Sequence, residues 1–398
     1  MRGRSLSIIG IEAYALFLAL FAGLRGITTD EAKYLLNIPY PHPPLVRAIL
    51  GAFDGMPGHE FFARLLFATI VVQSVWIIWM LARRLRPGTE LFLSFLYLAS
   101  SAVLIHGGTV MMSVLTAWQG LLFLAIALDP GADAEGSGAA VRSFLTGLLW
   151  LVSLFTAYHA ILFLPLVIGI LRKDRRSWRA IALYVGAPVL LLALYSFSNP
   201  LAIVRMFGTA STPATPVERV MSFLQIWSLG GSILLSAVGT IGLLRSRRWD
   251  VLGAFGLICL YILIARMPYH AILLTPFFVV GCLWFPHRML RSVRIQAFTV
   301  LVLAICSVAL LPSLEPNMSR QVATLLGAHG IGPGQLVRIV GPFGHQWQYE
   351  LSSPIIRDTA TLLKKDSDAL VCITQCTPED VKGMLQIRGE SVEVYVKK

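Results

Sequence analysis

Apolar stretches of about 18 to 24 residues recur along the chain up to about Pro312, separated by shorter polar segments. A bilayer-spanning helix needs about 20 apolar residues, so each stretch is long enough to cross a membrane. The pattern predicts a mostly α-helical, polytopic membrane protein with about eleven transmembrane helices. The expected spans are 7–27, 62–82, 89–106, 109–128, two short helices within 143–171, 180–198, 221–244, 250–266, 271–286 and 295–312. No small-residue cleavage site follows the first span, which we interpret as a retained signal anchor.

Basic residues cluster in alternate loops, and this pattern predicts which loops lie on the same side of the membrane. The clusters are Arg2 with Arg4, Arg83 to Arg86, Arg172 to Arg179, Arg245 to Arg248, and Arg288 to Arg294. Loops rich in lysine and arginine face the cytoplasm, so the intervening loops and the carboxyl-terminal tail are expected outside. The net charge of +12 is then a topology signal, and no nucleic-acid partner is expected.

The composition changes at about Ser313, where the long apolar stretches end. We therefore expect two domains, a membrane domain over 1–312 and a small extracytoplasmic α/β domain over 313–398. Valine- and isoleucine-rich segments predict strands, and two polar segments predict helices, the second with Thr377 as N-cap and Pro378 behind it. The strands are expected at 335–341, 368–374 and 391–397, and the helices at Ser353–Lys365 and Thr377–Gln386. Cys372 and Cys376 can form a disulfide if the tail faces an oxidising compartment, and the sequence leaves this question open.

One polar segment, Thr28–Leu45, follows the first apolar stretch directly and contains the adjacent acids Asp30 and Glu31. Acidic side chains are costly beside a membrane, so such a pair is a candidate functional site, with a solvated loop as the alternative. Further polar residues are expected at the same outer boundary. They include Tyr34, His42, Arg47, Arg64, Tyr158, His159, Arg266, Tyr269 and His270.

This combination suits transfer of a sugar from a polyprenyl phosphate. A carboxylate can act as general base on a hydroxyl acceptor. Cationic and phenolic groups can hold a phosphate and stabilise the charge that it gains on leaving. The alternatives for single residues are a membrane-interface anchor for a tyrosine or histidine, and a snorkelling role for Arg64 and Arg266.

Several motifs resemble a known family. The segment TTDEAKYL, then YPHPPL, then HEFFARLLFATIVVQSVWIIWMLARRL resembles the start of the dolichyl-phosphate-mannose protein mannosyltransferases and their bacterial relatives, the lipid A aminoarabinose transferases. TAYHAILFLPL and RMPYHAILLTPFF are similar to later segments of the same family. These proteins have the GT-C fold of integral membrane glycosyltransferases, and the resemblance covers about residues 1–285.

The resemblance implies an inverting transfer from a polyprenyl-phosphate sugar to a hydroxyl acceptor at the outer face. Asp30 would be the catalytic base, and Glu31 its structural or electrostatic partner. The residues expected to bind substrate are Tyr34, His42, Arg47, Tyr158, His159, Arg266, Tyr269 and His270. The sequence departs from the family at Met112-Ser113, where many members carry a second acid, and at Ala157, where they carry lysine. The sequence identifies no cofactor with certainty, and a divalent metal ion is left as an open alternative.

The expected partners are the polyprenyl-phosphate sugar donor, membrane lipids and an acceptor that is a lipid, a glycan or a protein. The expected location is the cell membrane of a bacterium or archaeon. Two other functions stay open. A transporter of lipid-linked sugars should show paired half-repeats and helices broken near mid-membrane, whereas a non-catalytic scaffold needs no carboxylate grouped with tyrosine and histidine.

Overall fold

The computed structural model describes most of the chain, in two compact units. The described ranges are 2–38, 42–129, 137–198, 214–285, 292–312, 315–342, 344–351, 353–357, 367–389 and 392–397. The larger unit comprises Met1–Ala22 and Tyr40–Pro312, and the smaller unit comprises Gly23–Pro39 and Ser313–Lys398. The acidic segment after the first helix therefore groups with the carboxyl-terminal tail.

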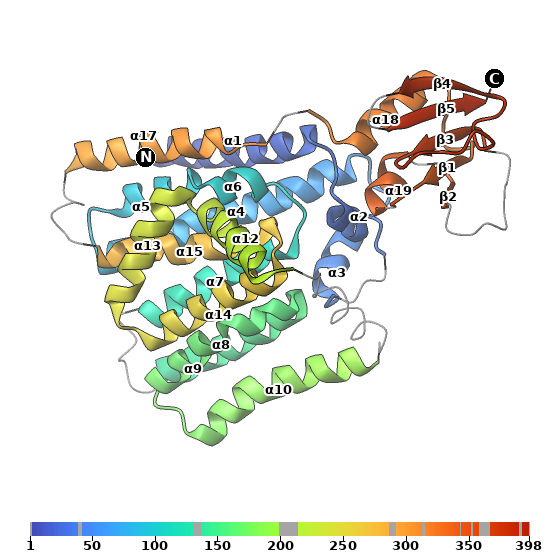
Figure 1. Ribbon diagram of the computed structural model, residues 1–398. Helices are drawn as coiled ribbons and strands as arrows, with labels where there is room; N and C mark the ends of the chain where they lie inside the picture. The colour runs from blue at the N-terminus through green and yellow to red at the C-terminus, as the bar shows by residue number, and fades with distance from the viewer. Residues whose placement is uncertain are drawn as a thin grey trace. The chain divides into compact units, whose positions relative to one another are not determined.

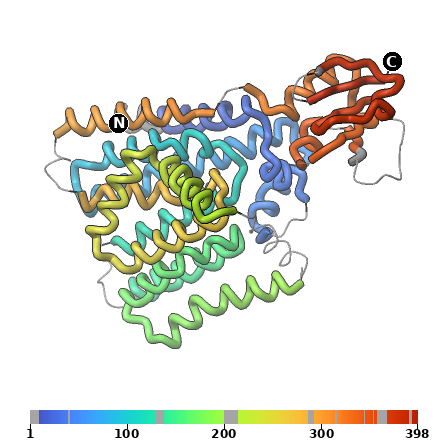
Figure 2. The backbone as a smooth tube through the Cα atoms, viewed as in Figure 1, coloured from blue at the N-terminus to red at the C-terminus, as the bar shows by residue number. Residues whose placement is uncertain are grey.

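The larger unit is built from helices, which Figure 1 labels and Figure 2 traces through the chain. They are α1 (Arg2–Leu24), α3 (Leu45–Gly51), α4 (His59–Leu85), α5 (Glu90–Leu98), α6 (Ser101–His106), α7 (Met112–Leu128), α8 (Ser137–Thr156), α9 (Leu164–Lys173), α10 (Trp178–Phe197), α12 (Pro216–Leu229), α13 (Ser232–Ser246), α14 (Trp249–Ala265), α15 (Ala271–Gly281) and α17 (Val293–Ala309). The 3₁₀ segments within the described part of this unit are η2 (Tyr158–Phe163), η3 (Pro268–His270) and η4 (Cys282–Trp284). Each expected span coincides with one or two of these helices, so the polytopic helical architecture is confirmed.

Helix length varies widely in this unit. Among the described residues, α4, α8 and α10 are long and apolar enough to cross a membrane alone, and five spans result if each of two bent helix pairs counts as one. The α7, α14 and α17 helices and the run from η3 to η4 are apolar but shorter. Much of the expected membrane part is therefore made of short or interrupted helices.

Two of these interruptions bear on the expected spans. The expected break near the middle of 143–171 is confirmed, since Ala157 is extended (φ −159°, ψ 138°) and η2 follows it. The single helix expected over 221–244 is wrong, because α12 and α13 meet there at a bend of 93°. Two glycines, Gly230 and Gly231, occupy the bend, and the next residue, Ser232, has a φ of +61°, which a continuous α-helix does not allow.

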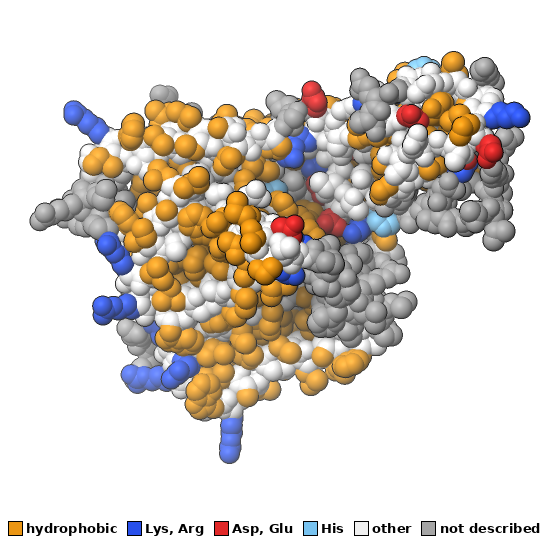
Figure 3. Space-filling model, in the orientation of Figure 1, with side chains coloured by type: hydrophobic (Ala, Val, Ile, Leu, Met, Phe, Trp, Pro, Cys, Tyr) orange, Lys and Arg blue, Asp and Glu red, His pale blue; other side chains and the backbone are white. Residues whose placement is uncertain are grey.

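The α15 helix forms the centre of the larger unit, since every residue from Ala271 to Gly281 is buried. It packs against α7 and α13. A Cβ atom on Gly242 of α13 would lie 1.9 Å from the carbonyl oxygen of Gly281, so these two backbones touch. Outer helices instead expose apolar side chains, such as Leu190 and Phe197 of α10, and such side chains cover much of the face in Figure 3. Exposed apolar area of this extent fits contact with lipid.

On the face that Figure 3 shows, most of the visible blue side chains of the larger unit lie along one edge. Ion pairs and hydrogen bonds join helix ends there. Arg84 lies 2.8 Å from the Asp129 carboxylate, and Lys173 donates to the Asp129 carbonyl at 2.8 Å. The buried Asp174 pairs with Arg142. The positive-inside pattern requires this one-sided grouping, and the side of the membrane that the edge faces stays a prediction.

In its described residues, the smaller unit contains a mixed β-sheet and three short helices. Its elements are α2 (Thr29–Leu35), α18 (Met318–Ala328), β1 (Val337–Val340), α19 (His345–Leu351), β2 (Ile355–Arg357), β3 (Ala369–Cys372), β4 (Met384–Gly389) and β5 (Glu393–Lys397). The strand order is β2-β1-β3-β5-β4, with β1 parallel to β2 and β3, and β5 antiparallel to β3 and β4. The strands expected within 335–341, 368–374 and 391–397 are therefore confirmed as β1, β3 and β5.

Apolar side chains of β1, β3 and β5 pack against one face of α18 and one face of α19 to form the core of the tail. Val322 and Leu326 come from α18, and Trp347 and Leu351 from α19. Each pair is spaced by four residues, which places both members on the same side of a helix. The tail thus has a hydrophobic core of its own.

The helix expected over Thr377–Gln386 is wrong. The Asp380 carboxylate accepts hydrogen bonds from the Thr377 backbone N–H at 3.1 Å and from its hydroxyl at 2.6 Å, which closes a turn instead of beginning a helix. The chain then continues as β4, because pairing with β5 overrides the local helix signal. Within the helix expected over Ser353–Lys365 the structure has β2, and residues 358–366 lie outside the described residues.

Two further links fasten this turn to the sheet. Arg338 of β1 forms an ion pair with Asp380 at 3.0 Å, and both side chains are largely buried. The hydrogen bonds from Thr377, together with the Arg338 charge, hold the pKa of Asp380 below its usual value of 3.8. Cys372 of β3 forms a disulfide with Cys376, which answers the question that their spacing left open.

Candidate active site

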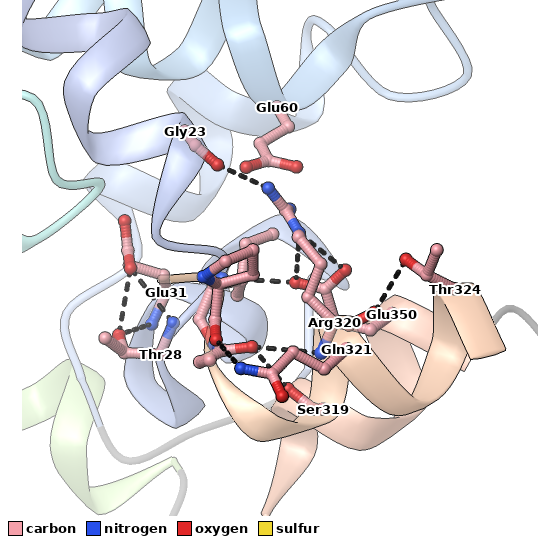
Figure 4. A network of polar contacts seen from close by, with 12 residues as sticks. Gly23, Thr28, Glu31, Glu60, Ser319, Arg320, Gln321, Thr324 and Glu350 are labelled. Carbon is pink, nitrogen blue, oxygen red and sulfur yellow. Dashed lines mark hydrogen bonds and ion pairs between the residues drawn. The ribbon is translucent and has the colours of Figure 1, made fainter. Parts of the chain in front are cut away.

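The acid pair lies in α2, and a capping box organises the first turn of this helix. The Thr28 hydroxyl accepts a hydrogen bond from the Glu31 backbone N–H at 3.3 Å. The Glu31 carboxylate accepts in return from the backbone N–H and the hydroxyl of Thr28, both at 3.0 Å (Figure 4). These bonds satisfy groups that a helix start otherwise leaves unpaired. Glu31 therefore has a structural role in α2.

The two adjacent acids differ in exposure. Glu31 is 1% exposed, whereas the side chain of Asp30 is 34% exposed. Asp30 forms an ion pair at 2.7 Å with Lys33, one turn further along α2. Tyr34 is buried. Of the two carboxylates, Asp30 is the one that a substrate can reach.

Three expected residues come together with Tyr261 in the larger unit, and we call the group the histidine cluster: His159, Tyr261, Tyr269 and His270. Tyr261 Oη and His270 Nε2 are 3.0 Å apart. The His270 ring centroid lies 5.3 Å from that of His159 and 4.5 Å from that of Tyr269. The His159 and Tyr261 rings stack at 5.7 Å. Both imidazoles are buried.

Breaks in the apolar helices place this cluster. η2 begins at Tyr158 after the extended Ala157, so His159 lies between α8 and α9. α14 ends at Ala265, its C-cap residue Arg266 has a φ of +54°, and η3 begins at Pro268, which has no N–H to lose at a helix start. Each break brings an imidazole out of a regular helix. The sequence contains both signals, since Pro268 and the polar TAYH segment interrupt apolar runs.

Sequence reasoning missed Tyr261, which lies within an expected span. A tyrosine in an apolar helix buries a hydroxyl that needs a hydrogen-bonding partner. That need is a usable signal, and here His270 meets it.

Of the remaining candidates, His42 interacts electrostatically with His159 and His270 of the histidine cluster. The Tyr158 hydroxyl lies 3.3 Å from Ser196 Oγ and therefore points to α10. His42 lies just before α3, and Arg47 lies on it. Their expected role in substrate binding stays a prediction.

Arg64 is one of two arginines for which snorkelling to the lipid head groups is the alternative to a role in the site. It is 1% exposed, forms an ion pair with Glu60 at 3.0 Å and donates to the Gly108 carbonyl at 3.4 Å. A snorkelling arginine keeps its guanidinium in water, so that interpretation is wrong for Arg64. A buried guanidinium requires pairing of this kind.

A divalent metal ion finds no ready-made site in the described part of the chain. No three His, Cys, Asp or Glu side chains there are arranged to hold one. Ser113, in the first turn of α7, is buried at the position where the resembling family often has an acid. A serine hydroxyl is a poorer ligand than a carboxylate for a hard cation.

No protein-family model matches the sequence, and no curated protein matches it. Solved structures are similar over nearly the whole chain. ArnT from Cupriavidus metallidurans in the apo state aligns with a TM-score of 0.66 and 14% identity, covering 99% of this chain and 98% of that one. The same protein bound to undecaprenyl phosphate aligns with a TM-score of 0.62 and 14% identity, covering 98% and 97%. An oligosaccharyltransferase from Archaeoglobus fulgidus, in complex with zinc and sulfate, gives a TM-score of 0.49 at 11% identity over 88% and 62%.

The likeness to ArnT establishes the fold. It extends from one end of the chain to the other, so it includes the tail as well as the membrane helices. The chain has the GT-C fold, as the amino-terminal motifs indicated.

Proposed function

We propose that this chain is an integral membrane glycosyltransferase. It transfers a sugar from a polyprenyl-phosphate donor to a hydroxyl acceptor, with inversion, at the extracytoplasmic face of a bacterial or archaeal cell membrane. The observation that carries this proposal is the fold shared over the full length with ArnT, which has been solved bound to undecaprenyl phosphate. The acid pair that follows the first helix supports it.

In the proposed reaction, Asp30 is the general base. Its carboxylate takes the proton of the acceptor hydroxyl as the oxygen attacks the anomeric carbon. The bond from that carbon to the phosphate oxygen breaks, and the polyprenyl phosphate leaves with the electron pair. Attack from the face opposite the phosphate inverts the configuration. The exposure of Asp30 and the structural role of Glu31 support this division between the two acids.

The proposed donor-binding residues are those that can hold or neutralise a phosphate. His159, Tyr269 and His270 supply imidazole and phenol groups from one cluster, and Arg266 supplies a cation two residues before η3. Donors of these types stabilise the charge that develops on a leaving phosphate. We also keep Tyr34, His42, Arg47 and Tyr158 in the proposed binding set.

The test is a transfer assay with the purified full chain in lipid vesicles. Polyprenyl-phosphate sugars of several kinds, labelled in the sugar, are offered with a membrane-lipid fraction and with glycan or peptide acceptors. We expect label to leave one donor and appear on one acceptor class, with release of polyprenyl phosphate. If none of the donors is cleaved, the proposal is refuted.

The same vesicles distinguish the alternatives. A transporter moves the intact labelled donor between leaflets without breaking its bond to phosphate, and a scaffold does neither. A reporter fused after Lys398 tests the orientation, because the proposal requires the tail to be outside. A cytoplasmic signal there would contradict the proposed topology.

A further inference from the structure

Both backbone groups of Ile27, just before α2, are hydrogen-bonded to the tail. The Asn317 side-chain amide, at the N-cap of α18, donates to the Ile27 carbonyl at 2.7 Å. The Ile27 backbone N–H donates to the Glu350 carboxylate of α19 at 3.2 Å. The Asn317 backbone N–H adds a bond of 2.9 Å to the Arg25 carbonyl. The tail thus holds the segment that leads into the acidic helix from two of its own helices.

A largely buried ion pair strengthens this attachment. Arg320 Nε lies 3.0 Å from both carboxylate oxygens of Glu350, whose side chain is 8% exposed. Arg320 also donates to the Gly23 carbonyl, as Figure 4 shows. The first residue of α2, Thr29, is hydrogen-bonded to Gln346 of α19. Hydrogen bonds to charged groups are about twice as strong as neutral ones, so the attachment is substantial.

Two faces of α19 make different contacts, one with the core of the tail and one with the segment that begins α2. In α19, Trp347 and Leu351 pack into the hydrophobic core, whereas Gln346 and Glu350 contact the segment Ile27–Thr29. Both pairs are spaced by four residues, so each forms one stripe of the helix. The attachment can therefore be weakened without emptying the core of the tail.

The acidic helix needs external support of this kind. α2 has only seven residues, whereas isolated helices shorter than about 12 residues are marginal in water. Its capping box closes the first turn but does not orient the helix. Contacts with α19 supply the packing surface.

We infer that the tail acts as a positioning domain, which holds α2 so that Asp30 points where the acceptor hydroxyl must be deprotonated. Asn317, Arg320 and Glu350 are its positioning residues. This inference rests on the proposed function, in which Asp30 is the base. It also assigns a task to the tail, to which the family motifs give none.

Asn317→Asp is the sharpest test. The aspartate retains the oxygen that caps α18 by accepting from the Arg320 N–H at 3.0 Å, but it loses the amide that donates to the Ile27 carbonyl. We expect faster hydrogen exchange at the amides of α2 and a kcat lower by about 10- to 100-fold, with the KM for the donor changed by less than about twofold. Exchange in β3 should stay as in the wild type.

Two other variants complete the design. Asp380→Asn removes the charge that pairs with Arg338, takes no part in the bonds to Ile27, and should leave both α2 exchange and kcat unchanged. Glu350→Gln keeps an acceptor oxygen for the Ile27 N–H but loses the charge that pairs with Arg320, so it should also speed exchange in α2 and lower kcat. It also provides an independent variant if Asn317→Asp fails to fold.

The inference is overturned if hydrogen exchange in α2 is unchanged in both Asn317→Asp and Glu350→Gln. It is also overturned if exchange in α2 becomes faster while kcat stays unchanged. Failure of the proposed function gives a different result, namely no donor cleavage by the wild type. The exchange data then still decide whether the tail holds α2.

Discussion

Replacing Asp30 with asparagine should nearly abolish sugar transfer. The amide is almost the same size as the carboxylate, but it cannot accept the proton of an attacking hydroxyl. Removal of a general base costs about 10² to 10⁴ in rate. That loss corresponds to about 2.7 to 5.5 kcal/mol in the activation barrier.

The same substitution should change stability far less. The contact that the structure shows for Asp30 is the ion pair with Lys33 at 2.7 Å, between residues three apart on one helix. Such a pair contributes about 0.2 to 0.5 kcal/mol, and the charge near the start of α2 adds about 0.3 to 1 kcal/mol. The expected effect on the barrier is larger than their sum, so loss of activity would not reflect unfolding.

The assay measures single-turnover transfer with donor and enzyme in excess over acceptor, next to two controls. Glu31→Gln keeps an oxygen that can accept from Thr28, since glutamine also serves in a capping box. Lys33→Gln removes the ion pair but leaves the Asp30 carboxylate. Both controls should keep much more activity than Asp30→Asn.

Two results would refute the reasoning. If Asp30→Asn turns over within about tenfold of the wild type, Asp30 is not the base, because base removal costs more than that. If Glu31→Gln loses far more activity than Asp30→Asn while α2 stays protected from exchange, the roles of the two acids are reversed.

Two further predictions follow from the tail. Gly26→Ala should loosen α2 and lower kcat, because Gly26 has a φ of +84° and an added Cβ would lie 2.8 Å from the Asn317 side chain. Hydrogen exchange at the α2 amides should become faster, and an exchange rate equal to that of the wild type would contradict the prediction. Asp380 has a pKa below 3.8 in the folded tail, so it stabilises the tail above that pH and this contribution is lost as the pH falls through 3.8 towards the lower folded value. The protection of β3 amides from exchange, relative to the intrinsic rate at each pH, should therefore fall with acidification in the wild type. In Asp380→Asn this protection should be lower at pH 7 and change less over the same range.

The sequence predicted the parts of the fold that local pattern controls. Apolar length located the membrane helices, and a polar interruption located the break at Ala157. Valine and isoleucine located β1, β3 and β5. The pattern Thr28-x-x-Glu31 is also a capping-box signal, so the structural role of Glu31 could have been predicted from the sequence as well.

Local pattern failed where a distant partner decides the structure. The Thr377–Gln386 segment has the residues of a helix start, yet β5 provides a pairing edge that makes its second half a strand. Tyr261 has the pattern of an ordinary residue in an apolar span, but η3 places His270 next to its hydroxyl. In each case the deciding contact joins residues that are not adjacent in sequence.

The sequence by itself determined that the chain is a polytopic helical membrane protein and that the adjacent acids after its first helix are the prime candidates for chemistry. The family resemblance implied different roles for Asp30 and Glu31, but only the tertiary structure showed that Asp30 is exposed and Glu31 buried, because exposure depends on what packs around α2. The structure alone also joined Ile27 to Asn317, which lie 290 residues apart. Hydropathy and propensity describe neighbours along the chain, whereas a hydrogen bond across that separation exists only after folding has brought the two segments of the smaller unit together.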